Sequence, residues 1–186
     1  MKQQLTKKAI RDSFLKLLAE RSFDKITVKS IVEDCGLTRN TFYYYYEDTY
    51  DILDDILTIE IEKYAVMASR GMNIHDIVGS FCKYAEENQS LVNHVLRSTK
   101  WDEIKIYVLK AVERGADMII DECAGEREIP AENRNIIKAV YRSAVGGLVE
   151  FWFQRGTAKG ISEKLIVLNE LFGDSMKIAV ERSVKK

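Results

Sequence analysis

Apolar residues recur at helical spacing along most of the chain, beginning near its start. The spacing i, i+4, i+7, i+8 is seen in Ile10, Phe14, Leu17 and Leu18. It predicts an amphipathic helix over residues 6–21, because residues at these intervals share one face. Further helices are predicted over residues 48–68, 73–87, 90–98 and 101–123, then from Pro130 to Arg155 and from Ser162 to about Ser183. With one proline, 46% hydrophobic residues and few alternating runs, the sequence predicts an all-α fold of about nine helices.

Two short helices joined by a tight turn are predicted between residues 27 and 46. One apolar face of the first is formed by Val28, Ile31, Val32 and Cys35. Gly36 ends this helix, because glycine tolerates the left-handed backbone found at helix ends. Leu37 is an apolar residue at the turn, and Thr38 can cap the second helix. This layout is typical of a helix–turn–helix, which docks its second helix in the major groove of DNA.

The composition of the second helix favours nucleic acid over the alternative, which is ordinary packing of two helices around a glycine. Residues 43–46 are four consecutive tyrosines, and a helix turns about 100° per residue, so they cannot all face a core. Phe42 and Tyr46 are predicted to point inward. An exposed phenol can donate to a phosphate, Arg39 can bind guanine, and Asn40 can pair with adenine. We therefore expect a DNA-binding regulator.

The distribution of charge agrees with this expectation, although the formal net charge of the chain is only −1. Residues 1–46 carry nine Lys/Arg and five Asp/Glu, a net charge of +4. Residues 47–62 carry seven Asp/Glu and no Lys/Arg, a net charge of −7. A basic segment followed by an acidic one indicates a phosphate-facing head and a separate body. The alternative is a chance fluctuation among solvated helix faces.

The first 53 residues resemble the DNA-binding domain of the TetR/AcrR family of bacterial transcriptional regulators. The matching residues are Phe23, Thr27, Ile31, Gly36, Thr38, Thr41, Phe42, Tyr43, Tyr45, Tyr46 and Leu53. The resemblance implies that Thr27 caps the second helix near a phosphate. It also implies backbone contacts from Thr38, Tyr43 and Tyr45, and base-facing positions for Arg39, Asn40 and Tyr44. The DNA-binding residues expected are Thr27, Lys29, Thr38, Arg39, Asn40, Thr41, Tyr43, Tyr44 and Tyr45.

The sequence departs from the family pattern at two positions. Tyr45 stands where a histidine is common, a change that preserves a hydrogen bond to phosphate. Thr49 stands where the family usually has a phosphate-binding lysine, which puts that contact in doubt. The resemblance implies a helix–turn–helix domain over residues 1–53 and a helical regulatory and dimerisation domain over residues 54–186. Gly71 and Asn73 mark a break in the helical pattern between head and body.

A stripe of small residues marks the helix from Pro130 to Arg155. Ala139, Ser143 and Gly147 lie at i, i+4 and i+8, with Gly146 beside them. Each glycine within a helix costs roughly 1 kcal/mol relative to alanine, and close approach of another helix would offset that cost. The family pairs its last two helices across a two-fold axis, and this region resembles that interface and the C-terminal domain of Gram-positive regulators. The interface residues expected are Ala139, Ser143, Gly147, Phe151, Leu165, Leu168, Phe172 and Met176; the alternative is intramolecular core.

The body is where this family binds small molecules, so its large side chains are candidate ligand contacts. They are Phe81, Tyr84, His94, Trp101, Tyr107 and Met118. Any one of them can equally be ordinary core. Because these residues offer few polar groups and no clear charge partner, the effector expected is hydrophobic or aromatic.

Enzymatic function finds no support in the sequence. His75 and His94 are the only histidines, and their spacing fits no zinc motif. The glycines form no phosphate-binding loop, and Asp54, Asp55, Glu60 and Glu62 resemble a solvated helix face. We expect no catalytic residues, metal or cofactor. A second alternative keeps the fold but binds a protein as a co-activator, as in regulators of dihydroxyacetone kinase; the intact Arg39 and Asn40 argue against it.

Cysteine usage and hydropathy favour the cytoplasm. Cys35, Cys82 and Cys123 are odd in number and far apart, which suits a reducing compartment. No apolar run approaches the ~20 residues needed to span a bilayer, and no secretory signal is recognised. We expect a homodimeric cytoplasmic repressor that leaves a palindromic double-stranded operator when a small molecule binds.

Overall fold

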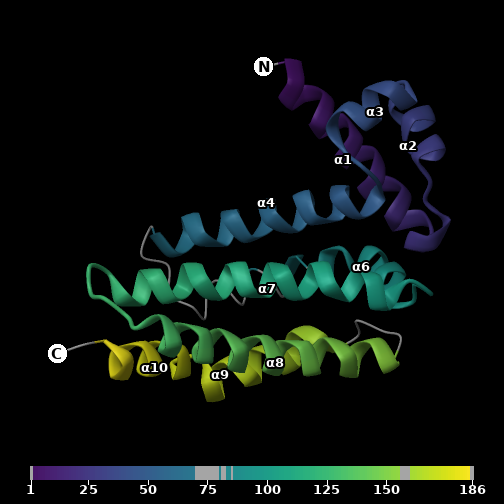
Figure 1. Cartoon of the computed structure of the whole chain (residues 1–186). Helices are drawn as coiled ribbons and strands as arrows, with labels where there is room; N and C mark the ends of the chain where they lie inside the picture. Colours follow the sequence, from purple (N-terminus) through teal and green to yellow (C-terminus); the bar gives the residue numbers. More distant parts are fainter. Residues whose placement is uncertain (1, 70–79, 81–82, 85, 156–159, 185–186) are drawn as a thin grey trace.

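The computed structural model describes residues 2–69, 80, 83–84, 86–155 and 160–184 (Figure 1). Within these residues there are helices and no strands, which confirms the predicted all-α fold. The elements are, in order, α1 (Lys2–Glu20), the short 3-10 helix η1 (Phe23–Lys25), α2 (Val28–Cys35), α3 (Arg39–Tyr45), α4 (Thr49–Ser69), α6 (Gln89–Leu96), α7 (Trp101–Ala124), α8 (Ala131–Arg155), α9 (Ile161–Phe172) and α10 (Ser175–Ser183).

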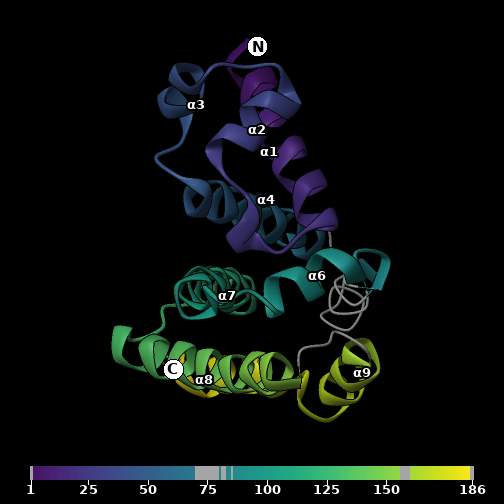
Figure 2. The ribbon, with the colours of Figure 1, turned by 90° about the vertical axis from the view of Figure 1, so that its right-hand side faces the viewer.

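Helices α1, α2 and α3 form a small head that sits on one end of α4 (Figures 1 and 2). The head closes around Phe14, Phe23 and Phe42, all fully buried, together with Ile31 and Ile52. Phe14 and Phe23 meet edge to face, with their ring centroids 5.9 Å apart. Burying each ring stabilises the fold by roughly 1.5–3 kcal/mol, and this apolar cluster fixes how the three helices are oriented.

The turn between α2 and α3 is built as the sequence predicts. Thr27 and Ser30 form a reciprocal cap at the start of α2, in which the Ser30 N–H donates to the Thr27 Oγ1 over 3.1 Å. Gly36 ends α2 in the left-handed conformation, with φ of 67°. Thr38 then caps α3 by accepting from the Thr41 N–H over 3.1 Å. These bonds satisfy helix-end groups that would otherwise lack partners, and they set the direction of α3.

The body is a stack of long helices in which α7 lies between α4 and α8 (Figures 1 and 2). Helix α10 packs against both α7 and α8. A second apolar core joins these elements through Ala116, Ile120, Ile137, Met176 and Val180. No helix within the described residues is long and apolar enough to cross a membrane.

Helix α6 joins the body to the head. Leu96 of α6 belongs to the same apolar cluster as the head residues, together with Trp101 and Ile104 of α7. The Ser90 Oγ donates to the Ala19 carbonyl, and the His94 Nδ1–H donates to the Leu18 carbonyl, each over 2.8 Å. Side chains of α6 therefore satisfy carbonyls at the end of α1, which that helix cannot pair by itself.

Two predictions for the last third of the chain differ from the structure. The single helix predicted from Ser162 to Ser183 is two helices, α9 and α10, because the chain turns at Gly173 and Asp174. Helix α8 begins at Ala131, and Pro130 precedes it with its carbonyl accepting from the Arg134 N–H. Residues 73–79 of another predicted helix, with the break at Gly71 and Asn73, lie outside the described residues.

Candidate nucleic-acid interface

The exposed surface of α3 carries the side chains predicted to read DNA. Arg39 and Asn40 are exposed in its first turn. Tyr43 and Tyr44 are 58% and 71% exposed. Phe42 on the opposite face is fully buried in the head core, as is Tyr46 just after the helix. The buried pair fixes the rotation of α3, so Arg39, Asn40 and the two tyrosines face outward.

Tyr45 and Thr41 are less accessible than their neighbours. Tyr45 is half-buried against the head core, and its ring meets Tyr44 edge to face with centroids 4.9 Å apart. Thr41 is half-buried, and its hydroxyl lies 2.9 Å from that of Thr38. Both threonine hydroxyls thus support the helix start, while the phenols of Tyr43 and Tyr44 extend furthest.

The start of α2 and the start of α4 flank α3 with opposite charge. Lys29 is exposed on α2, with its Nζ 3.8 Å from a Glu33 carboxylate oxygen. At the other flank the Asp48 carboxylate caps α4, accepting from the Tyr50 and Asp51 N–H groups over 2.7 and 3.0 Å. Glu47 and Asp48 are exposed beside Thr49. The position where the family usually has lysine therefore lies in acidic surroundings, which weaken attraction to phosphate there.

A hydrogen-bonded cluster beneath α3 was not predicted. The Asp55 carboxylate on α4 accepts from the Tyr46 hydroxyl over 2.5 Å and from the Arg11 guanidinium over 2.7 Å. The Lys7 Nζ lies 5.0 Å from the centre of the Tyr46 ring. Burial raises the pKa of Asp55, but the bonds from Tyr46 and Arg11 outweigh it and hold the pKa below its ordinary value. Burial and Asp55 raise the pKa of Tyr46, so the phenol remains a donor.

This cluster corrects the expectation that Asp54 and Asp55 belong to a solvated helix face. Asp55 bonds to α1 and to the end of α3, and Asp54 at the preceding position pairs with Arg114 of α7 over 3.0 Å. Nothing in the sequence could have indicated these partners, because Arg11 and Asp55 are 44 positions apart and Asp54 and Arg114 are 60 apart.

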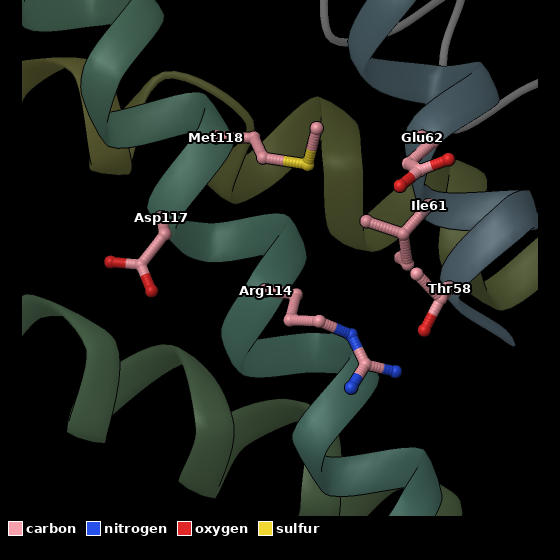
Figure 3. Close-up of a pocket in the computed structure, with 6 residues that line it drawn as sticks. All are labelled: Thr58, Ile61, Glu62, Arg114, Asp117 and Met118. Atoms are coloured by element: carbon pink, nitrogen blue, oxygen red, sulfur yellow. The ribbon is translucent and has the colours of Figure 1, made fainter. Parts of the chain in front are cut away.

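A pocket of about 260 Å³ lies between α4 and α7. Its lining consists of Thr58, Ile61 and Glu62 from α4, and Arg114, Asp117 and Met118 from α7 (Figure 3). Met118 is the one member of the predicted ligand set among these six residues.

The other described residues of the predicted ligand set are not among the six that line this pocket. Trp101 is only 3% exposed, within the apolar cluster shared by head and body. Tyr107 stacks on Tyr50 of α4, with centroids 5.7 Å apart. His94 is bonded to α1, Tyr84 is half-buried, and Phe81 lies outside the described residues.

The predicted small-residue stripe lies on the exposed face of α8. Ala139, Ser143 and Gly147 are exposed, and a Cβ placed on Gly147 would meet no atom of the chain within 4 Å. The neighbouring Gly146 has a different environment, since a Cβ there would lie 3.0 Å from the Leu109 Cδ2 on α7. Close helix approach within the chain therefore accounts for Gly146 but not for Gly147.

Helix α9 adds apolar surface next to this face. Ile166, Val167, Leu171 and Phe172 are exposed on it. Leu165 and Leu168 are half-buried, and Leu165 packs on the main core. Phe151 is 40% exposed and lies beneath the Arg155 guanidinium, 4.2 Å from its ring centre. Met176 is only 5% exposed, so it packs inside the chain rather than on the predicted interface.

Comparison with known proteins agrees with both parts of the chain. Residues 10–56 match the family described as "Bacterial regulatory proteins, tetR family". Residues 72–171, more than half of the chain, match a "Transcriptional regulator C-terminal region". The uncharacterised helix–turn–helix regulator YxbF of Bacillus subtilis is 35% identical over 48 residues, which are 26% of this chain and 13% of that protein.

Solved structures show the same fold at low sequence identity. The dihydroxyacetone kinase operon activator DhaS has a TM-score of 0.63 at 17% identity, covering 97% of this chain and 98% of that one. The TetR family repressor AlkX from Dietzia sp. has a TM-score of 0.60 at 14% identity, with 95% and 98% covered. A TetR regulator from Streptococcus agalactiae has a TM-score of 0.56 at 21% identity, with 99% and 96% covered.

The first family match covers the helix–turn–helix, and the second covers most of the body. The Arg39 and Asn40 side chains, which the sequence predicts to read DNA, are exposed within the first matched segment. The chain therefore belongs to the TetR family of bacterial regulatory proteins, and it is a DNA-binding transcriptional regulator.

Proposed function

We propose that the protein is a homodimeric repressor that binds a near-palindromic operator and is released from it by a small molecule. The observation that carries this proposal is the orientation of α3, whose first turn exposes Arg39 and Asn40 while Phe42 is buried beneath it. Residues 1–53 act as the DNA-binding unit and residues 54–186 as the regulatory and dimerisation unit. The site of action is the cytoplasm, where the chromosome lies.

In this function Arg39 and Asn40 read base edges, and the hydroxyl and ammonium groups around them fix the register. A guanidinium can bond guanine O6 and N7 together, and a carboxamide can bond adenine N6 and N7. Thr27, Lys29, Thr38, Thr41, Tyr43 and Tyr45 contact the DNA backbone, and Tyr44 contacts the bases. Backbone contacts carry no sequence information, so Arg39, Asn40 and Tyr44 provide the specificity.

The dimer forms through the exposed faces of α8 and α9. Ala139, Ser143 and Gly147 allow close approach of a partner helix, and the apolar residues exposed on α9 supply surface to bury. A two-fold axis there presents two copies of α3 to the same side of a duplex. Half-sites are then separated by about one helical turn, near 34 Å, or a multiple of it.

Release from DNA follows from the position of α4. Its start is bonded to the end of α3 through Tyr46 and Asp55, and its middle lines the pocket beside α7. A ligand that prefers one arrangement of α4 and α7 must therefore also favour one spacing of the two heads. A two-fold dimer on DNA tolerates little change in that spacing.

The co-activator alternative is not favoured. The fold likeness to DhaS is at 17% identity and concerns the fold alone. TetR-family regulators are generally non-enzymatic DNA-binding proteins, and the exposed Arg39 and Asn40 suit duplex binding.

Selection of bound duplexes from a random library tests the proposal. We expect enrichment of a near-palindrome bound by a dimer, with affinity falling steeply between 50 and 200 mM salt because phosphate neutralisation releases counterions, at roughly 10³-fold for six contacts. A shuffled duplex of the same composition is the control. Binding that is indifferent to both sequence and salt would contradict the proposal.

A further inference from the structure

The pocket between α4 and α7 combines apolar walls with one cation. Ile61 and Met118 face each other across it, and the Arg114 guanidinium lies toward the α4 side (Figure 3). Next to Arg114, a Cβ on Gly115 would lie 3.4 Å from the Ile61 Cδ1, so α4 and α7 are in close contact here. A ligand entering the pocket therefore meets both helices at once.

Arg114 has donor capacity that its present partner does not use. Its Nη2 donates to the Asp54 Oδ1 over 3.0 Å, and both side chains are about one-third exposed. Its Nε is buried and donates no hydrogen bond within the described part of the chain. A guanidinium carries five donors in a planar fork that matches the two oxygens of a carboxylate, and such paired bonds are stronger than a single one.

The two acidic residues that line the pocket, Glu62 and Asp117, do not neutralise the charge of Arg114. Asp117 is held by Arg134 at 3.2 Å and by Lys138 at 2.6 Å, both on α8. Its carboxylate points away from the α4 side chains in Figure 3. Glu62 is exposed, so water screens its charge. Arg114 is thus the one cation among the six lining residues, and Asp54 is its ion-pair partner.

We propose that the effector is a small amphipathic carboxylate, whose carboxylate binds Arg114 in place of Asp54 while its apolar part lies against Ile61 and Met118. This inference rests on the proposed effector role of the pocket and names the chemistry of its ligand. The sequence offered no charge partner for an effector, and Arg114 supplies one.

Loss of the ion pair between Arg114 and Asp54 affects the head because Asp54 is adjacent on α4 to Asp55, which bonds the head. Asp54 fastens α4 to α7, and Asp55 fastens α4 to Tyr46 and Arg11. When a ligand takes Arg114, Asp54 loses its partner and turns to solvent, so the ion pair that holds this part of α4 against α7 is gone. Helix α4 then tilts, and Tyr46 at the end of the recognition helix moves with it.

Calorimetry on the full-length dimer with three probes of equal chain length tests the ligand class. Octanoate, 1-octanol and octylammonium each have eight carbons and carry a negative, neutral and positive head group, respectively. We expect octanoate to bind about tenfold tighter than 1-octanol, the effect of hydrogen bonds to charged groups, and octylammonium to bind most weakly. Equal binding of octanoate and 1-octanol, or tightest binding of octylammonium, overturns the proposal.

Three variants test whether Arg114 causes the preference for octanoate. Arg114→Gln is expected to bring octanoate down to the affinity of 1-octanol. The matched control Arg142→Gln removes an exposed arginine that pairs with Glu113 of α7 but does not line the pocket, and it should keep the preference. Asp54→Asn frees Arg114 from its partner, so octanoate should bind about fivefold tighter to it than to the native protein. If Arg114→Gln still binds octanoate more tightly than 1-octanol, or if Asp54→Asn binds octanoate no more tightly than the native protein, the ligand does not replace Asp54 at Arg114.

Operator binding separates the ligand class from the effector role. With a selected duplex, octanoate should lower operator affinity about fivefold or more, and Asp54→Asn should lower it without ligand. Octanoate that binds through Arg114 but leaves operator affinity unchanged contradicts the effector role alone. Release by 1-octanol but not by octanoate contradicts the carboxylate and leaves the effector role standing.

Discussion

Neighbouring residues of α3 have different roles because a helix turns about 100° per residue. Phe42 and Tyr46 are buried in the head core, whereas Tyr43 and Tyr44 are exposed. The four consecutive tyrosines therefore divide into an inner anchor, a half-buried Tyr45 and two outer side chains. Specificity and general affinity should accordingly respond to different substitutions.

Arg39→Ala or Asn40→Ala should lose about 1–3 kcal/mol on the selected operator and little on random DNA, because each removes a base contact. Tyr43→Phe or Lys29→Ala should weaken both duplexes together, because phosphates carry no sequence information. Titrations of the two duplexes at one salt concentration measure this difference. If Arg39→Ala weakens every sequence equally, the assigned reading face is wrong.

Gly36 carries the one left-handed backbone position of the helix–turn–helix, with φ of 67°, and a Cβ there would meet no atom within 4 Å. Gly36→Ala should therefore cost only backbone strain, about 1–2 kcal/mol of unfolding free energy. Gly36→Asn is the control and should cost less, because asparagine tolerates this conformation. Urea denaturation measures both. An alanine variant as stable as the native chain would mean that the turn does not require the left-handed residue.

Between elements, the junction of α1, α3 and α4 depends on one carboxylate. Asp55 receives hydrogen bonds from Tyr46 and Arg11, so three elements meet at a single acceptor group. Side chains of α6 hold the far end of α1 through the Leu18 and Ala19 carbonyls. The body is thus bonded to α1 at its middle, through Arg11, and at its C-terminal end, through Leu18 and Ala19. Movement of the body can therefore be transmitted to the head through these contacts.

Tyr46→Phe should lower the free energy of unfolding by about 1–2 kcal/mol at neutral pH, because it removes a hydrogen bond to a charged group while the ring stays buried. The pKa of Asp55 is lowered in the folded state from its ordinary 3.8. Its stabilisation is therefore complete above that value and is lost as pH falls through the lower folded pKa. The difference between native and variant proteins should shrink below about pH 4.

The exposed Tyr43 provides the control for that measurement. Tyr43→Phe removes the same hydroxyl from a side chain that is 58% exposed, so unfolding free energy should not change at any pH. Denaturant titrations from pH 3 to 7 follow both variants, a range set by the ordinary carboxyl pKa of about 4. A Tyr46→Phe effect that is constant across this range would rule out Asp55 as the partner that matters.

At the scale of the whole molecule, the exposed faces of α8 and α9 account for the proposed dimer. Helix α10 packs against α7 and α8, while α9 presents Ile166, Val167, Leu171 and Phe172 to solvent. Figure 2 shows α9 set to one side of α8. Exposed apolar surface beside a small-residue stripe is typical of a face covered by a partner.

Gly147→Leu should convert the dimer to a monomer and abolish operator binding, because the new side chain separates the paired stripes. Space within one chain is open at Gly147, so the monomer should remain folded. Light scattering gives the mass, and circular dichroism reports the fold. Glu122→Leu adds the same side chain to an exposed position of α7 and should leave the dimer intact. A Gly147→Leu protein that is still dimeric would place the interface elsewhere.

The sequence by itself determined the helix–turn–helix, because its determinants are local. The caps at Thr27 and Thr38 and the left-handed Gly36 act within a few residues of their own positions. The apolar period of α1 and α2 likewise predicted their buried faces, since side chains at helical spacing share one side. The turn at Gly173 was missed because α9 and α10 together keep one continuous apolar pattern.

Only the tertiary structure decided which residues became partners across the fold. Asp55 pairs with Arg11, Asp54 pairs with Arg114 in the pocket, and His94 bonds a carbonyl of α1, over separations of 44, 60 and 76 residues. Sequence periodicity places a side chain on a face but does not say which distant helix packs against that face. For the same reason Trp101 and Met176, large residues available for a pocket or an interface, are buried by packing that no local pattern encodes.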